Sequence, residues 1–498
     1  MKAGGEPALI GIDLGTSAVK VLAVTAGGRQ IADGSEFYGL VTPQAGRVEQ
    51  DVDVVYRATM RVLERVLADV RLRGSEVRAI GFSSAMHGVI AVDAAGEALS
   101  NVITWMDRRS ADVAERWRAD GTGAQLYAHT GAPMHPMLPV AKLRWLAEND
   151  PDLFARARRF VGLKELFVYR WTGEWLIDWG LASATGLFAF ATHAWEPAAL
   201  AAAGVDAHRL SAPVAPSTAL RSFRPAIARE LQLDADVAVV LGSSDGALAN
   251  IGVGAAERDV AVTLGTSGAV RILAPAPALD ASGRTFCYCA GDDTFVIGGP
   301  TSAAGASLDW IFALLLDEVP KADRFLRAVE LAMEVAPGAS GLTVLPFFAG
   351  ERAPYWNASM RGAFGAIDLS HDRRTIVRAA FESVVFGVNA VYHIVVERAG
   401  PAERLLLSGG LTKAPFVRQL LADIFETSAV EPHQQEASAF GAALLAAQAI
   451  GAIDDALATA RSTGYETPVD PDATRSATYR DAYKRYRRAV AAELARAG

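Results

Sequence analysis

Features of several protein classes are missing from this sequence of 498 residues. It has only two cysteines, Cys287 and Cys289, and their C-x-C spacing matches neither a disulfide framework nor a zinc site, so we expect reduced thiols in a strand. No run of about 18 uninterrupted apolar residues occurs, which argues against a membrane-spanning helix. The first apolar run, Ala8 to Ile12, meets Asp13 at once, so we expect no signal peptide and a cytoplasmic protein.

The chain also lacks a net positive charge, because 56 Asp and Glu residues outnumber 48 Lys and Arg residues and give a formal net charge of −8. We therefore expect no partner that is bound through overall charge, neither nucleic acid nor an anionic membrane. One basic cluster lies near the C-terminus, in a segment whose helical periodicity puts tyrosines on the opposite side. This pattern predicts the solvated face of a docked helix, with Arg480, Lys484, Arg485, Arg487 and Arg488 outside and Tyr479, Tyr483, Tyr486 and Val490 inside.

Apolar residues make up 51% of the chain and charged residues 21%, which is typical of a globular protein with a substantial core. A chain of this length exceeds one ordinary core, so two large domains are the simplest prediction. We place them at residues 1–255 and 256–498, because each half opens with the same strand–turn–strand pattern.

The repeated pattern is built around a shared Leu-Gly-Thr-Ser. Leu9–Ser17 leads into Val19–Val24 in the first half, and Val260–Ser267 leads into Ala269–Leu273 in the second. Four matching residues are compatible with chance, but the surrounding apolar pattern repeats as well. Glycine turns bring backbone N–H groups close to an anion, so two such turns across a cleft could hold a polyphosphate. Neither turn is a Walker A loop, since the pattern G-x-x-x-x-G-K-S/T is absent.

The two halves also share an apolar strand that ends in small polar residues before a helix. Val237–Gly246 has this pattern in the first half and Leu405–Gly410 in the second. Strand ends that lead into helices are where α/β folds place ligands. The glycine turns differ in one respect, because Asp13 stands where the second turn has Thr263, so only the first can offer a carboxylate to a metal ion.

From Ile10 to about Ala449 the chain resembles the FGGY family of carbohydrate kinases. Met137–Asn149 is similar to the first family signature and Gly362–Glu382 to the second, with Gly365-Ala-Ile367 where most members have an aromatic residue, glycine and an aliphatic residue. The resemblance implies an α/β fold of the duplicated two-domain actin/hexokinase-like (ribonuclease H-like) type with an interdomain cleft. It also implies an enzyme that uses ATP and Mg²⁺ to phosphorylate a small polyol, sugar or sugar acid.

The resemblance places the nucleotide site residue by residue. Asp13 falls near the Mg²⁺, and Ala414 stands where relatives often have Asn, so we expect backbone contacts to replace a hydrogen bond to the base. The phosphate-binding positions are Thr16, Ser17, Lys20 and Thr266, and the nucleotide sugar and base positions are Gly305, Asp309, Gly409, Gly410 and Ala414.

The family's catalytic base falls on Asp245. Phosphoryl transfer to a hydroxyl is mostly positioning and charge neutralisation, with one carboxylate to take the proton. Asp245 lies at the mouth of an apolar strand, between Ser244 and Gly246, where a carboxylate suits that task. The residues alone leave an alternative open, since Asp before a helix most often serves as its N-cap.

Positions that contact the sugar in the family fall on Met86, His87, Trp105, Asp107, Arg108 and His135. A lone histidine after an apolar strand is more often structural. Here His87, Trp105 and His135 all lie at predicted strand or loop ends before Asp245, which favours a shared site. An aromatic face beside polar groups is a common pairing in sugar sites.

Three strings resemble the family's gluconate kinases, namely Phe82–His87, Thr130–Met137 and Val161–Glu165. Xylulose kinases of the family usually have Gln where this chain has Ala85. These strings favour a sugar acid over a neutral ketose.

Gluconate is an anion, so its site needs a cation or several N–H donors. Arg108, Lys164 and the two histidines are the candidates, because a guanidinium can hold a carboxylate bidentately. Arg108 and Arg109 could instead pair with Asp107 or Asp112 on a helix face, and we expect this pairing for Arg109.

Phosphorylation of D-gluconate to 6-phosphogluconate is therefore the predicted function, with a xylulose kinase or another pentulose or polyol kinase of the family as the alternative. A non-catalytic sugar-binding regulator on the same fold would be expected to lose Asp13 or Asp245, and both are present. The expected partners are small molecules, ATP and the sugar. The sequence leaves the oligomeric state open, a homodimer included.

Overall fold

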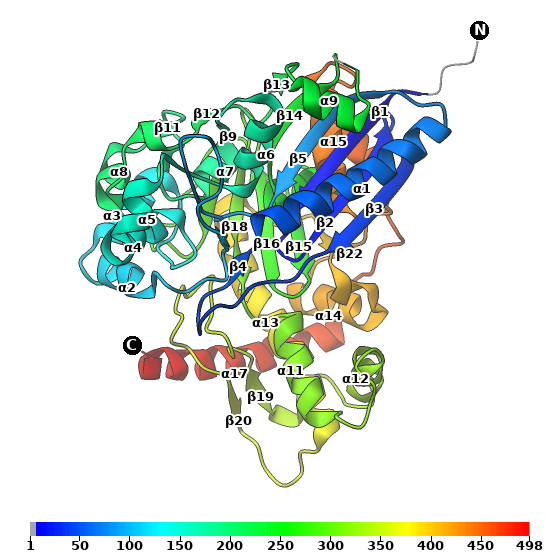
Figure 1. Cartoon of the computed structure of the whole chain (residues 1–498). Coiled ribbons are helices and arrows are strands. Elements are labelled where there is room, and N and C mark those ends of the chain that lie inside the picture. The colour runs from blue at the N-terminus through cyan, green and yellow to red at the C-terminus, as the bar shows by residue number, and fades with distance from the viewer. Residues whose placement is uncertain (1–5, 235, 498) are drawn as a thin grey trace.

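Two six-stranded sheets organise the chain, one in each half (Figure 1). The computed structural model describes residues 6–234 and 236–497. In spatial order the first sheet comprises β13 (Ala219–Leu220), β14 (Ala238–Ser244), β5 (Val77–Ser84), β1 (Ala8–Leu14), β2 (Ala18–Thr25) and β3 (Gln30–Phe37). The second comprises β17 (Phe286–Cys289), β18 (Phe295–Thr301), β16 (Gly268–Ala274), β15 (Asp259–Leu264), β21 (Arg404–Ser408) and β22 (Ala429–Val430).

The two sheets repeat one topology, as the sequence predicts. β1 pairs antiparallel with β2 and parallel with β5, and in the same way β15 pairs antiparallel with β16 and parallel with β21. The strand-to-helix pattern also recurs, since β14 leads directly into α10 (Asp245–Gly252), and β21 leads through a short 3-10 turn into α14 (Pro415–Phe425). The duplicated α/β fold is therefore confirmed.

The two halves meet through α10 and α15 (Ala437–Ala449), which pack against each other. α15 comes from the second half of the sequence but also lies on β1 and β5 of the first sheet. A Cβ atom on Gly11 would stand 1.8 Å from the carbonyl oxygen of Ala439, and one on Gly81 would stand 2.3 Å from that of Ala442. Only glycine fits at these two positions, so the joint between the halves depends on them.

Smaller elements surround the two sheets. α1 (Val52–Leu72) packs against β2 and β3 of the first sheet, and its buried apolar residues share one hydrophobic cluster with Ile10 and Val19. Short elements that follow β5 form a lobe beside this sheet, at the left of Figure 1. They are β6 (Ile90–Val92), β7 (Val102–Ile103), α2 (Ala111–Ala119), α3 (Thr122–Thr130), α4 (Pro139–Asn149), α5 (Pro151–Arg156), β8 (Arg159–Val161), α6 (Leu163–Thr172), β9 (Leu176–Asp178), α7 (Trp179–Ser183), β10 (Phe188–Ala189), β11 (Ala194–Trp195), α8 (Pro197–Ala203) and β12 (Ala212–Val214). The others are β4 (Glu49–Gln50), α9 (Pro225–Leu231), α11 (Gly305–Leu315), α12 (Arg324–Met333), β19 (Thr343–Leu345), β20 (Ala363–Gly365) and α16 (Ala456–Ser462).

Two long helices complete the second half. α13 (Arg373–Ala399) is the one helix of the described ranges that is long and apolar enough to cross a membrane, but 89% of its apolar stretch is buried inside the protein. α17 (Ala473–Ala497) buries Tyr479, Tyr486 and Val490 and exposes Arg480. The docked helix is confirmed, but its basic face is only partly solvated, because Arg485 is half-buried and its Nη2 donates to the carbonyl oxygen of Gly338 at 3.2 Å.

Two local features bear on the expectations from sequence. Cys287 and Cys289 are free and buried within β17, as predicted. Ala366 follows β20 with φ at +60°, in the left-handed region that favours glycine, which explains why most members of the resembled family have glycine there.

Candidate active site

The first glycine turn, between β1 and β2, is held through its carbonyl groups. The N–H of Gly15 donates to the oxygen of Ala18 at 3.0 Å and closes the turn. The side-chain amide of Gln50 donates to the carbonyl oxygens of Gly15 and Thr16, at 3.1 and 2.8 Å. These bonds occupy the groups that would repel a phosphate, and the neighbouring Ser17 is exposed.

The second glycine turn supports the N-terminus of α11. The N–H of Gly305 donates to the oxygen of Gly265, and that of Ala306 donates to the oxygen of Thr266, both at 3.0 Å. A Cβ atom on Gly305 would stand 2.6 Å from the oxygen of Gly265, so this approach needs glycine. The structure therefore brings Thr266 and Gly305 together, with Asp309 exposed one turn farther along the helix.

A cavity of about 240 Å³ lies between the two halves. Its lining includes Lys20 of β2, together with Gly409 and Gly410 at the end of β21. Lys20 also links the halves, because its Nζ lies 2.7 Å from a carboxylate oxygen of Glu436. Three predicted nucleotide residues thus share one cavity, whereas Ala414 is buried at the N-cap of α14 and does not line it.

Two carboxylates lie where the halves face each other, Asp13 at the end of β1 and Asp245 at the start of α10. Ser83 Oγ donates to Asp13 at 2.8 Å, and the N–H of Gly246 donates to Asp245 at 2.7 Å. Burial raises the pKa of both groups. Burial and the negative charge of Asp245 together raise the pKa of Asp13 to about 6. Such a pair is stabilised by a nearby cation.

The role of N-cap belongs to Ser244, not to Asp245. Ser244 has extended backbone geometry and its Oγ accepts from the N–H of Ala247 at 3.3 Å, whereas Asp245 is the first residue of α10. The N-cap alternative for Asp245 is therefore wrong, although its carboxylate accepts one first-turn N–H, that of Gly246.

Sequence reasoning missed two arginines whose charges act on Asp245. The charges of Arg271 on β16 and of Arg352 after β19 both act on the pKa of Asp245, against the effect of burial. Arg352 is buried, its Cζ lies 4.6 Å from the ring centre of Trp105, and its Nη2 donates to the oxygen of Thr301 at 2.8 Å. Only Arg271 left a signal in the sequence, as a charged residue within an apolar strand.

The two predicted histidines are neutral and differ in tautomer. Burial lowers the pKa of His87 to about 3 and that of His135 well below its ordinary value. His87 Nδ1 lies 2.7 Å from the carbonyl oxygen of Ala184, so this nitrogen carries the proton. His135 Nδ1 accepts from the N–H of Met137 at 3.2 Å, so its proton is on Nε2. We assign the tautomers from these partners; His87 then offers an Nε2 acceptor and His135 an Nε2–H donor.

Trp105 connects the sugar residues to the first phosphate turn. Its Nε1–H donates to Thr16 Oγ1 at 2.8 Å, and Met86 lines the same narrow space as Trp105 and Thr16. Arg108 is exposed, and its Nη2 donates to the carbonyl oxygen of Ala358 in the second half at 3.3 Å. The structure therefore gathers Met86, Trp105 and Thr16, and it places Arg108 at the contact between the halves.

Two of the predicted substrate contacts need correction. Lys164 is 1% exposed, and its Nζ lies 2.6 Å from Asp178, so its charge is neutralised inside the protein. Asp107 is 1% exposed and accepts two hydrogen bonds from the guanidinium of Arg109, both at 2.8 Å. Burial alone would raise the pKa of Asp107, but Arg109 holds it below its ordinary value. The pairing expected for Arg109 is confirmed, and neither buried group is free to bind a sugar.

Lys142 on α4 is a positioning residue that sequence reasoning missed, although it lies within the segment that resembles a family signature. Its Nζ donates to the carbonyl oxygens of His87, Ile103 and Thr104, at 2.7, 3.2 and 2.7 Å. Burial lowers the pKa of Lys142 to about 7. This side chain fixes the loops that carry His87 and Trp105.

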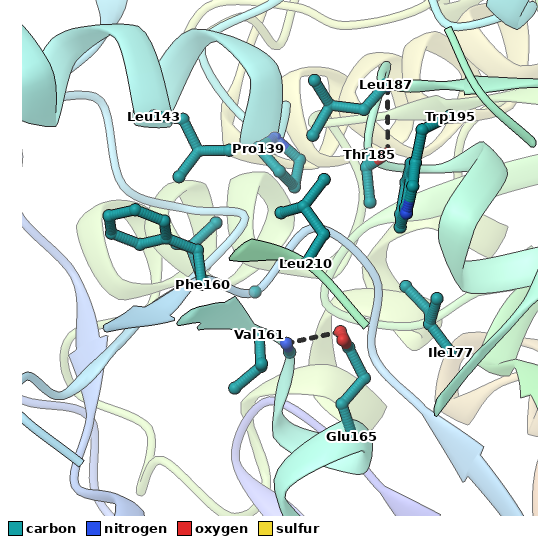
Figure 2. A pocket seen from close by; sticks show the side chains of 13 residues that line it. Pro139, Leu143, Phe160, Val161, Glu165, Ile177, Thr185, Leu187, Trp195 and Leu210 are labelled. Carbon is teal, nitrogen blue, oxygen red and sulfur yellow. Dashed lines mark hydrogen bonds between the residues drawn. The ribbon is translucent and has the colours of Figure 1, made fainter. Parts of the chain in front are cut away.

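A small cavity of about 30 Å³ lies behind the loop of His87 (Figure 2). Apolar side chains line most of it, among them Leu143, Phe160 and Leu210. Figure 2 shows the carboxylate of Glu165 directed at the N–H of Gly162, which donates to it. The volume suits a water molecule rather than a sugar, so this cavity belongs to the support of the site.

The fold and the site define a phosphotransferase of the duplicated actin and hexokinase architecture. Residues 8–252 match the N-terminal domain of the FGGY family of carbohydrate kinases, and residues 260–450 match its C-terminal domain. The chain belongs to this family and is a carbohydrate kinase.

Known proteins of high similarity include both gluconate and xylulose kinases. The chain is 36% identical to a gluconokinase of Bacillus licheniformis over 454 residues, which covers 90% of this chain and 88% of the relative. A gluconate kinase structure from Lactobacillus acidophilus superimposes with a TM-score of 0.92 at 30% identity, covering 98% of both chains. A ligand-bound xylulose kinase structure from the same organism gives 0.93 at 30% identity, covering 99% of both chains. The fold alone therefore does not separate the two substrates.

Proposed function

We propose that this protein is a cytoplasmic kinase that transfers the γ-phosphoryl group of ATP to D-gluconate, giving 6-phosphogluconate, with Mg²⁺ as the metal ion. The main support for gluconate as the substrate is the group of arginine side chains whose positive charges act on the neutral His135. Burial lowers the pKa of this histidine, and the charges of Arg352, Arg118 and Arg108 lower it further. A neutral ketose needs no positively charged side chains in its site, whereas a carboxylate is bound well by guanidinium groups.

The polar groups around the sugar suit a polyhydroxy acid. The Nε2–H of His135 can donate and the Nε2 of His87 can accept, so two hydroxyl groups find complementary partners. Asp245 then takes the proton of the hydroxyl that is phosphorylated, as a general base within hydrogen-bond reach. Arg108 is the proposed partner of the carboxylate.

The residues present fit a magnesium ion that binds together with the nucleotide. Within residues 6–234 and 236–497, no group of three or more His, Cys, Asp or Glu side chains could hold a metal by itself. Mg²⁺ usually needs only one or two carboxylates, because phosphates and water supply the other ligands. Asp13 would hold it, because burial and the negative charge of Asp245 raise the pKa of this carboxyl group and a cation beside it would offset both effects. When bound, the ion neutralises phosphate charge.

A coupled assay of ADP release over gluconate, xylulose, ribulose and glycerol, with the product identified, tests the proposal. We expect the highest kcat/KM for gluconate and a strict dependence on Mg²⁺. An equal or higher kcat/KM for xylulose would favour a pentulose kinase. A non-catalytic regulator would release no ADP with any of these compounds.

A further inference from the structure

Arg271 is a desolvated cation that lies beside the catalytic carboxylate without an anion of its own. Burial lowers its pKa, and the charge of Asp245 opposes this effect. In the described part of the chain, the one hydrogen bond of its guanidinium runs from Nη1 to Thr263 Oγ1 at 3.3 Å, and its buried Nε has no partner. A guanidinium has five N–H donors, so most of the binding capacity of Arg271 is unused.

Two glycines and a threonine surround the side chain of Arg271. A Cβ atom on Gly246 would lie 3.0 Å from the Nε of Arg271, and one on Gly298 would lie 3.1 Å from its Cγ. Because both neighbours are glycines without side chains, the side chain of Arg271 fits between them. Thr263, which the Nη1 contacts, is the last residue but one of β15 and directly precedes the second glycine turn. Arg271 thus lies between a phosphate turn of the second half and Asp245 of the first.

We propose that Arg271 contacts the phosphoryl group during its transfer, as a catalytic arginine that the second half contributes. The inference rests on the proposed function, since it requires phosphoryl transfer beside Asp245. The acceptor oxygen forms a bond to the γ-phosphorus while the bond from this phosphorus to the β–γ bridging oxygen breaks. ADP leaves with that electron pair, and Asp245 takes the hydroxyl proton. The peripheral oxygens carry the developing charge, which the free N–H donors of Arg271 stabilise.

The sugar carboxylate is not the anion that suits this position. In gluconate the carboxylate is five carbon–carbon bonds away from the hydroxyl at the other end of the chain, and that hydroxyl must lie next to Asp245. Arg271 packs against Gly246, the neighbour of Asp245, and therefore lies at the hydroxyl end.

The test measures kcat and KM for Arg271→Gln and Arg271→Lys, with gluconate and with a neutral acceptor, together with ATP hydrolysis in the absence of sugar. We expect Arg271→Gln to lower kcat by about 10²- to 10³-fold with either acceptor, and to lower ATP hydrolysis in parallel, with KM values nearly unchanged. Arg271→Lys should recover part of the loss, because it keeps a point charge. Added guanidinium should restore turnover to Arg271→Ala but not to wild type.

Arg373→Gln is the matched control, since it removes an exposed arginine of the same half that pairs with Glu318. Its kcat should equal that of wild type. A higher KM for gluconate alone, with ATP hydrolysis unchanged in Arg271→Gln, would overturn the inference in favour of carboxylate binding. Normal kcat in Arg271→Gln would overturn it as well. An inactive wild-type enzyme would instead refute the proposed function itself.

Discussion

Three ionisable side chains behind the sugar residues are almost inaccessible to solvent, namely Lys164, Asp178 and Glu165. Lys164 and Asp178 neutralise each other at 2.6 Å. Among residues 6–234 and 236–497, Glu165 has no such partner at ion-pair distance, and it accepts a hydrogen bond from the N–H of Gly162 instead. Burial therefore raises the pKa of Glu165 to about 7. A carboxyl group in this position is stable when protonated and costly when ionised.

Glu165→Gln should stabilise the protein at alkaline pH. The pKa of Glu165 lies near 7 in the folded protein, above its ordinary value of 4.5, so between these values the folded protein holds a proton that the unfolded chain has lost. The free energy of unfolding therefore falls as pH rises through this range, and the loss is complete above pH 7. The amide keeps the acceptor for Gly162 and has no such proton. Urea denaturation at pH 8 should show a gain on the order of 1–3 kcal/mol, which shrinks at pH 5. A variant that is less stable than wild type at pH 8 would contradict this account.

At the scale of elements, the loops after β5 and β7 carry residues that are predicted to contact the sugar. A side chain from another helix holds these loops in place. Lys142, which lies on α4, donates hydrogen bonds to carbonyl oxygens in both loops. Removal of the ammonium would leave the carbonyl oxygen of His87 without a donor, whereas that of Thr104 would keep the N–H of Asp107. The arrangement makes α4 the support of His87 and Trp105.

Lys142→Met should raise the KM for the sugar by about 10-fold or more and leave the KM for ATP nearly unchanged, because the nucleotide cavity does not include α4. The carbonyl oxygen of His87, left without a donor, should also lower the free energy of unfolding by about 1–3 kcal/mol. Steady-state kinetics and denaturation measure the two effects. Lys484→Met is the control, since Lys484 is exposed on α17 and should change neither quantity. A normal KM for the sugar in Lys142→Met would show that the two loops keep their conformation without Lys142, which would contradict this account.

The elements of the fold were predictable where local sequence specifies them. The paired glycine turns and the apolar strands before α10 and α14 follow from residue type and spacing. Sequence reasoning missed Arg271, Arg352 and Lys142. Each acts on residues that are far from it in the sequence, so no local pattern could indicate its role. The error at Lys164 has the same origin, because packing brings its partner Asp178 to it. Asp107 differs, since its partner Arg109 is two residues away and their pairing was expected from the sequence. Family resemblance placed both groups at the site but could not show that their charges were already neutralised.

At the scale of the whole molecule, the site is shared between two bodies that meet at α10 and α15. The phosphate turns lie in different halves, and both must reach one nucleotide. We expect gluconate and a non-hydrolysable nucleotide together to decrease the radius of gyration in small-angle scattering, as in other hinged kinases. An unchanged scattering profile would show that the site is preformed.

Asp245 lies where the two halves meet, so its substitution tests the central claim of a kinase that uses this carboxylate as its base. The most direct measurement is the turnover of Asp245→Asn with gluconate and ATP. Ser244 already caps α10, so the variant should fold with a change in stability well below about 1 kcal/mol. The amide can accept a hydrogen bond from the hydroxyl but cannot take its proton at neutral pH. We predict nearly unchanged gluconate affinity and a kcat lowered on the order of 10²- to 10⁴-fold. A folded Asp245→Asn protein that turns over gluconate at close to the wild-type rate would contradict the account.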